Sequence, residues 1–326
     1  MPSSSIFSNP YYNQTFVGFI LEFFQRLGAL FTGQLTIEQL ASDEIQVFIL
    51  MGVAISSALV GSFLVLRRMT MLANSLSHTI LMGIVLAYFF TSGQVEQGSI
   101  PPMQAMLIAA LITGFLTTFL TEFLTKVGRL QEDASTGLVF TTLFALGVIL
   151  VTILTRDAHI GTEAVMGNVD ALHYKDLFWV YFIVVLNGVL MTLFFKEFQL
   201  TTFDPGLAKA MGFSPFFFNY LLMAQVSATT ITSFRAVGVL LVLAFMTAPP
   251  LAARLLTHRL VSLLGWAMGL GAICSLVGVA LTRHLLTVYG IALSTSGVVV
   301  CTLLVCYLLV LCFAPGRGLI SLRGRT

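Results

Sequence analysis

Nine stretches of mainly apolar residues, each about as long as a membrane-crossing helix, make up most of this chain. A helix needs about 20 mainly apolar residues to cross the hydrocarbon layer of a bilayer. The stretches cover residues 43–66, 73–91, 103–125, 134–155, 177–195, 215–233, 235–256, 260–281 and 294–313. This pattern predicts an all-α, polytopic integral membrane protein, folded as a helical bundle with about nine transmembrane helices.

Composition and the connecting segments exclude a soluble protein. Hydrophobic residues make up 57% of the 326 residues and charged residues 9%, whereas soluble domains contain roughly 45–50% and about 25%. The longest polar connections, 92–102, 156–176 and 196–214, are too short to bury a core of their own. No run of basic residues suggests a nucleic-acid partner.

Residues 14–32 form a tenth apolar candidate near the N-terminus. They include Glu22 and Arg26, two charged side chains that a membrane span would have to bury. We therefore expect an interfacial amphipathic helix here, with a tenth span as the alternative.

Small residues at a spacing of four occur in two of the apolar stretches, as Ser57/Gly61 and Gly265/Gly269. Small residues let helices approach closely within lipid, so we expect both pairs to serve packing in the bundle.

Lysine and arginine are distributed unequally when the nine spans are threaded with the N-terminus outside. The inner side holds Arg67, Arg68, Lys126, Arg129, Lys196, Lys209, Arg254, Arg259, Arg317, Arg323 and Arg325. The outer side holds Arg26, Arg156, Lys175, Arg235 and Arg283. Positive residues gather on the cytoplasmic side of membrane proteins. We therefore expect the C-terminus and loop 196–214 in the cytoplasm and loop 156–176 outside.

The second apolar stretch carries coordinating side chains on one helical face. Asn74, His78 and Met82 lie at positions i, i+4 and i+8, with Ser75 adjacent. A titratable group at membrane depth costs several kcal/mol and persists mainly where function needs it. Imidazole suits zinc, ferrous iron and manganese, and an amide oxygen suits harder ions. From these residues alone, a metal-contacting face and a histidine bonded to a neighbouring helix both stay open.

Two segments on the predicted inner side carry residues that favour the start of a helix. Asp204 can cap a short helix that begins at Pro205, and Gly212 can end it. Such a helix suits docking to a partner, although an ordinary capped loop has the same pattern. Glu132 and Asp133 open the fourth stretch, where the helix dipole favours carboxylates by about 0.3–1 kcal/mol.

Four segments together resemble one protein family. They are LRR followed by ANSLSH, EDASTGLVFTTLFALGV, FDPGLAKAMGF and AVGVLLVLAFMTAPPLAARLL. They are similar to the membrane permease subunit of the ABC-3 family of metal-ion ABC importers, which carry manganese, zinc or iron. The resemblance runs from about Asp43 to the C-terminus. It implies a fold like that of type II ABC importers, with an N-terminal extension at residues 1–42 and the permease domain at 43–326.

The resemblance also implies roles for the residues above. The helix with Asn74, His78 and Met82 would line the path of the metal, and Asn74 stands where the family commonly has aspartate. The segment holding Asp204, Pro205, Gly206, Lys209 and Gly212 would be the coupling helix that docks on the ATPase. The acidic pair Glu132 and Asp133 would lie near the same ATPase.

The implied protein is a transport subunit and not an enzyme. No G-x-x-x-x-G-K-[ST] motif occurs, so a separate cytoplasmic ATPase dimer would hydrolyse ATP. The other implied partners are the lipid bilayer, an extracytoplasmic metal-binding protein and a second permease subunit. That subunit is identical or paralogous, and a paralogue could supply the carboxylate missing at Asn74. No cofactor is bound permanently, the cargo is manganese, zinc or ferrous iron, and the location is the bacterial cytoplasmic membrane.

Two other classes of protein remain as alternatives. An ATP-independent secondary transporter or channel would usually show discontinuous helices or acidic residues at mid-membrane depth. An intramembrane hydrolase would need a base oriented toward Ser75 or Ser77, and no residue on that helix is placed to orient His78.

The charge asymmetry predicts that Lys209 and Glu163 face opposite sides of the membrane. Single cysteines at these two positions, in a variant without the native cysteines, should react with a membrane-impermeant thiol reagent from opposite sides of sealed vesicles. Labelling of both from the same side would contradict the nine-span topology.

Overall fold

The computed structural model describes residues 10–11, 14–36, 39–91, 103–154, 169, 172 and 174–314. Within these residues a long helix occupies each of the nine predicted stretches. They are α2 (Ser42–Leu66), α3 (Thr70–Thr91), α4 (Met103–Lys126), α5 (Glu132–Leu154), α7 (Tyr174–Leu193), α10 (Pro215–Val237), α11 (Val239–Leu256), α12 (Leu260–Tyr289) and α13 (Thr295–Phe313). Three shorter helices are α1 (Phe16–Phe31), α8 (Phe195–Phe203) and α9 (Pro205–Ala210). Most of loop 156–176 lies outside the described residues.

Seven helices in the described part of the chain are long and apolar enough to cross a membrane. They are α2, α4, α5, α7, α11, α12 and α13. Helix α10 is not among them, and it carries buried amide and hydroxyl side chains such as Gln225, Thr229 and Thr230. The all-α, multi-pass membrane class is thus confirmed, and the count of nine crossing segments stays a prediction.

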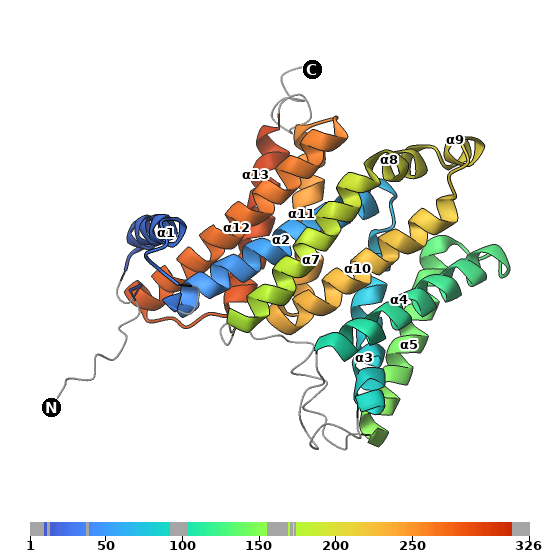
Figure 1. Cartoon of the computed structure of the whole chain (residues 1–326), viewed down its shortest axis with the longest axis horizontal. Coiled ribbons are helices and arrows are strands. Elements are labelled where there is room, and N and C mark those ends of the chain that lie inside the picture. The colour runs from blue at the N-terminus through green and yellow to red at the C-terminus, as the bar shows by residue number, and fades with distance from the viewer. Residues whose placement is uncertain are drawn as a thin grey trace.

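Helix α2 runs through the middle of the bundle (Figure 1). It contacts α7, α10, α11 and α12, whereas α3, α4 and α5 pack with one another at one end of the molecule. Over an 18-residue window, 83% of α2 is buried, against 11% of α13. Because α2 is surrounded on most sides, its position sets the positions of its neighbours.

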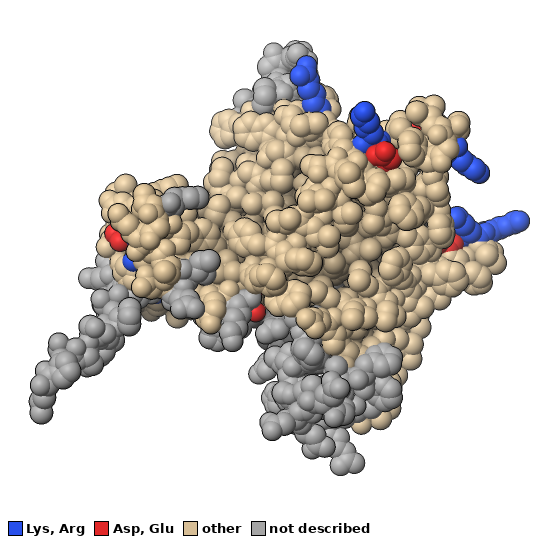
Figure 2. Space-filling model, viewed as in Figure 1, with Lys and Arg blue, Asp and Glu red and all other residues tan. Residues whose placement is uncertain are grey.

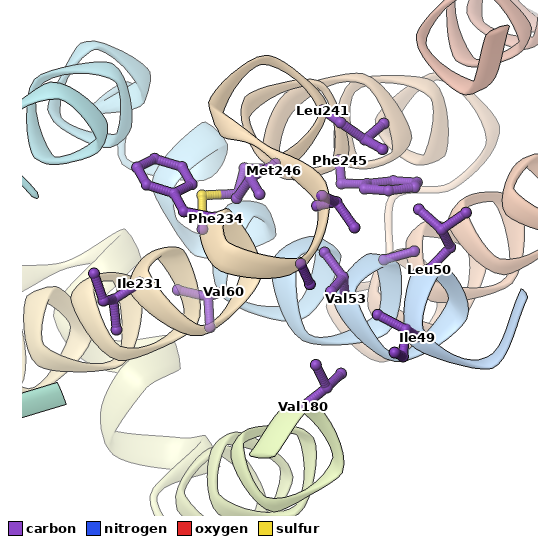
Figure 3. Packing of buried hydrophobic residues seen from close by; sticks show 14 of the residues in the cluster. Ile49, Leu50, Val53, Val60, Val180, Ile231, Phe234, Leu241, Phe245 and Met246 are labelled. Atoms are coloured by element: carbon purple, nitrogen blue, oxygen red, sulfur yellow. The ribbon is translucent and has the colours of Figure 1, made fainter. Parts of the chain in front are cut away.

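The core forms around this central helix (Figure 3). Four apolar side chains of α2, Ile49, Leu50, Val53 and Val60, are buried. Their neighbours come from α7, α10 and α11 and include Val180, Ile231, Phe234, Phe245 and Met246. Lipid tails are as apolar as these side chains, so close van der Waals packing, and not burial from water, holds the helices together within the membrane.

The break between the sixth and seventh stretches lies later than the sequence indicated. We expected it at residue 234, but α10 continues to Val237 and the chain turns at Gly238, whose φ is 82°. Glycine adopts positive φ without the steric cost that a Cβ brings. The turn therefore forms at Gly238.

Helix α1 lies at the edge of the bundle beside α12 and is seen end-on in Figure 1. Three groups converge on the buried carboxylate of Glu44 at the start of α2. The Tyr11 hydroxyl donates to Oε1 at 2.7 Å, the Arg26 guanidinium donates to both oxygens, and the Ala41 amide donates to Oε2 at 2.8 Å. Burial and the bond to Glu44 raise the pKa of Tyr11. The carboxylate therefore anchors the N-terminal segment to α2.

Only one of the two small-residue pairs brings backbones together among the described residues. A Cβ added at Gly61 would lie 2.1 Å from the carbonyl oxygen of Met246, so α2 and α11 touch through their backbones there. Nothing described lies within 4 Å of a Cβ added at Gly265 or Gly269. The packing prediction is confirmed at Gly61, while the glycines of α12 have no such contact within this chain.

Gly61→Ala should lower the free energy of unfolding by about 1–3 kcal/mol, because the added methyl forces two backbones apart. Gly269→Ala is the matched control and should be neutral or stabilising by up to about 1 kcal/mol, the helix propensity that alanine adds. Thermal unfolding in detergent would compare them, and equal midpoints would contradict the close contact.

Candidate functional site

Helix α3, which carries Asn74, His78 and Met82, packs on α5 at one end of the molecule. The side chains of Asn74 and Met82 are partly exposed, and that of His78 lies outside the described residues. A Cβ added at Gly147 of α5 would lie 3.0 Å from the backbone nitrogen of Met82. Helix α5 therefore approaches the backbone of α3 closely at Met82.

The adjacent face of α3 packs on α4 through hydroxyl groups. The Thr117 hydroxyl donates to that of Thr79 at 3.2 Å, and both side chains are buried. One turn further on, a Cβ added at Gly83 would lie 2.9 Å from Oγ1 of Thr113. Because Thr79 lies five positions after Asn74, the two side chains leave α3 about 140° apart. The contact with α4 thus turns Asn74 away from α4.

Among the described side chains, no group of three or more His, Cys, Asp or Glu gathers as metal ligands would.

Helix α9 has the caps that the sequence predicts. The Asp204 carboxylate accepts from the Leu207 amide at 2.9 Å, and Pro205 occupies the first turn. At the other end Gly212 has a φ of 88° and its amide donates to the Lys209 carbonyl at 3.1 Å. The capping of this short helix is confirmed, and its docking role stays a prediction.

The α8–α9 segment and the start of α10 present apolar surface that sequence patterns did not reveal. Phe203, Leu207, Met211 and Phe216 are between 48% and 59% exposed around Gly206 and Lys209, which are also exposed. An exposed apolar group of this kind, rimmed by polar residues, is typical of protein contact surfaces.

Basic side chains gather along the same end of the molecule. In Figure 2 the blue atoms lie mainly along the upper and right rim, over α9, the top of α7 and the turn between α4 and α5. Lys126, at the end of α4, pairs with Glu122 and lies 5.8 Å from the ring centroid of Phe216. Asp133 is exposed in the first turn of α5, and the side chain of Glu132 lies outside the described residues. The predicted contact residues of α9 and α5 therefore share this rim.

Arg67 is a residue of this end that we did not predict as part of the site. It caps the C-terminus of α2, and its guanidinium donates to the hydroxyls of Thr201 and Thr202 at 3.0 Å each and to Oδ1 of Asn219 at 3.3 Å. Burial lowers its pKa to about 10, so it stays charged at neutral pH. The only sequence signal was the Arg67-Arg68 pair between two apolar stretches.

Comparisons with known proteins place the chain in one family. The model of the ABC 3 transport family matches residues 43–314. A probable metal transport system membrane protein of Chlamydia trachomatis is 40% identical over 97% of this chain and 97% of its own length. The manganese transport system membrane protein MntD of Bacillus subtilis is 37% identical over 84% of this chain and 92% of its own length.

A zinc relative and a solved structure are also similar. The zinc transport system membrane protein TroD of Treponema pallidum is 38% identical over 62% of this chain and 57% of its own length. The structure of PsaBC from Streptococcus pneumoniae in complex with Fab has a TM-score of 0.74 at 24% identity, covering 93% of this chain and 99% of that one. This likeness shows a common fold. From the family model and the relatives, the chain belongs to the ABC 3 transport family.

Proposed function

We propose that this chain is the permease subunit of an ATP-driven importer that carries manganese or zinc into the bacterial cytoplasm. The observation that carries the proposal is the exposed, doubly capped helix α9 at the basic end of a membrane bundle that belongs to the ABC 3 family. The relatives' names support manganese and zinc. No relative described above is named for iron, so ferrous iron is left out of the proposal.

The orientation follows from the basic rim. Positive residues favour the cytoplasmic side, so α9 and the α4–α5 turn would face the cytoplasm. The start of α2 and the attached helix α1 would then lie at the outer side. We assign residues 1–42 to an extension whose helix lies at the membrane–water interface on the outer side of the cytoplasmic membrane. Residues 43–326 form the permease domain. This arrangement suits a multi-pass protein of the bacterial cytoplasmic membrane.

Transport would involve three kinds of partner and no covalent chemistry in this chain. An extracytoplasmic binding protein would deliver the ion, and a second permease subunit would complete the path. Helix α9 would dock on a cytoplasmic ATPase dimer. Asp204, Pro205, Gly206, Lys209 and Gly212 would form the docking element. Glu132 and Asp133, on the same rim, would contact the ATPase as well. Family membership favours this function over a secondary transporter or an intramembrane hydrolase.

The metal path would run along Asn74, His78 and Met82 of α3. His78 would supply a nitrogen ligand and Asn74 an amide oxygen. Asn74 carries no charge, so a paralogous second subunit would contribute the carboxylate that a divalent ion favours. ATP binding would close the ATPase dimer, move α9 and switch this path from outward to inward facing.

Gly212→Trp should uncouple the importer, because it places a bulky residue with a strained positive φ at the end of α9. We expect metal-stimulated ATP hydrolysis in liposomes to fall about tenfold, which corresponds to about 1.4 kcal/mol of lost docking free energy. Gly265→Trp is the matched control on an exposed, unpacked glycine. Equal activity of the two variants would argue against docking through α9, and Asp204→Arg provides a second test at the other end of the helix.

His78→Leu should reduce uptake of radioactive manganese and zinc about tenfold or more, because it removes the imidazole nitrogen ligand from α3. His258→Leu, at an exposed turn, should leave uptake unchanged. Asn74→Asp adds a hard oxygen ligand and should shift the ratio of manganese to zinc uptake. Uptake would be measured in cells without other importers, with co-purification of the ATPase as the assembly control. Normal uptake by an assembled His78→Leu permease would remove His78 from the path.

A further inference from the structure

We propose that Arg67 is a positioning residue that transmits movement of the α8–α9 segment to α2 and, through the turn that follows, to α3. This inference rests on the proposed function, in which the ATPase moves α9.

The guanidinium of Arg67 connects three elements that are distant in the sequence. It extends from the end of α2, bonds to Thr201 and Thr202 near the end of α8, and bonds to Asn219 in α10. Arginine presents several donors in one rigid plane, so a single side chain can hold several acceptors in fixed relative positions. All three acceptors are neutral. A displacement of α8 therefore pulls on α2 and α10 together.

The backbone at this point fixes the direction of the Arg67 side chain. Arg68 takes the left-handed conformation, with a φ of 61°, at a place where helices usually have glycine. The amides of Arg68 and Met69 donate back to the carbonyls of Val65 and Leu64 at 3.2 and 2.9 Å. This closed turn leaves Arg68 exposed and directs Arg67 toward α8.

An apolar contact supports the polar one. The buried ring of Phe198 in α8 lies 5.6 Å, between centroids, from Phe63 of α2 and from Phe218 of α10. Only Asp204 separates α8 from α9, so the two short helices are closely linked. Beside them is a cavity of about 370 Å³, lined by Arg67, Pro205 and Phe216 among others. The cavity provides space for the segment to shift against α2 and α10.

The displacement has a direct route to the predicted metal path. Helix α3 begins at Thr70, three residues after Arg67, and carries Asn74 and His78 in its first turns. Deeper in the bundle, Asn187 of α7 donates to Ser56 of α2 and Thr229 of α10 at 2.7 Å each. Helices α2 and α10 are thus joined at two levels and should move together. The start of α3 follows the end of α2.

Arg67→Gln and Arg68→Gln form a matched pair, since both remove one positive charge but only Arg67 holds α8. The purified permease with its ATPase, in liposomes, would give the number of ions transported per ATP hydrolysed. We expect this ratio to fall about tenfold in Arg67→Gln, because bonds to a charged donor are lost. It should stay within about twofold of wild type in Arg68→Gln. Arg67→Lys keeps the positive charge but loses the planar set of guanidinium donors. Its ratio of ions transported to ATP hydrolysed should lie between those of wild type and Arg67→Gln. A purely structural role would lower the yield of complex and leave the ratio unchanged.

The double variant Thr201→Val with Thr202→Val keeps Arg67 and removes its acceptors in α8. It therefore tests the role of these hydrogen bonds even if Arg67→Gln fails to assemble. Amide hydrogen exchange of the permease in detergent provides a readout that requires neither metal nor ATP. We expect exchange in residues 195–210 to rise about tenfold in Arg67→Gln and in the double variant, and not in Arg68→Gln. Unchanged exchange in the double variant would overturn the Arg67 proposal. A wild-type complex that transports neither manganese nor zinc would instead overturn the proposed function.

Discussion

The close contact of α2 with the helices around it is the constraint on which the rest of the bundle depends. Within lipid, apolar side chains gain little by leaving one apolar surface for another, so helices associate through close backbone approach and hydrogen bonds. Helix α2 uses both. Gly61 brings its backbone against that of α11, and Ser56 joins the buried bonds of Asn187 and Thr229. Ser56 lies near the middle of α2 and Gly61 about four-fifths of the way along it, so these contacts hold the body of the helix while its two ends meet different partners.

The two ends of α2 are held by interactions of different strength. At the N-terminal end the carboxylate of Glu44 accepts hydrogen bonds from Arg26, Tyr11 and a backbone amide, and Asp43 pairs with Arg283 at 3.0 Å. At the C-terminal end Arg67 is bonded to neutral hydroxyl and amide groups. Charge-paired hydrogen bonds are stronger than those with one neutral partner. In the function that we propose, the C-terminal end of α2 faces the ATPase and can adjust, while the N-terminal end stays anchored.

The polar residues of α3 fit the same arrangement. Thr79 and Thr117 hold one face of α3 on α4, and the next face around the helix carries Asn74. Helix α3 starts directly after the turn that holds Arg67. In the function that we propose, the helix lining the path therefore begins beside the segment that the ATPase would move. The predicted metal-contacting residues, Asn74 and His78, then lie within about eleven residues of Arg67, which would transmit the movement of the ATPase.

The sequence by itself determined the features that depend on neighbours along the chain. A run of about 20 apolar residues is a helix in a membrane wherever it packs, so all nine long helices were predictable. The cap of α9 joins Asp204 to a residue three positions away, and the shared face of Asn74 and His78 follows from the helical repeat. Only the tertiary structure decided the rest. Gly61 and Gly269 have the same local pattern, yet only Gly61 meets another backbone within the described chain. The acceptors of Arg67 lie 134 to 152 residues away. The choice of neighbours depends on how all the helices fill space together, which no local pattern records.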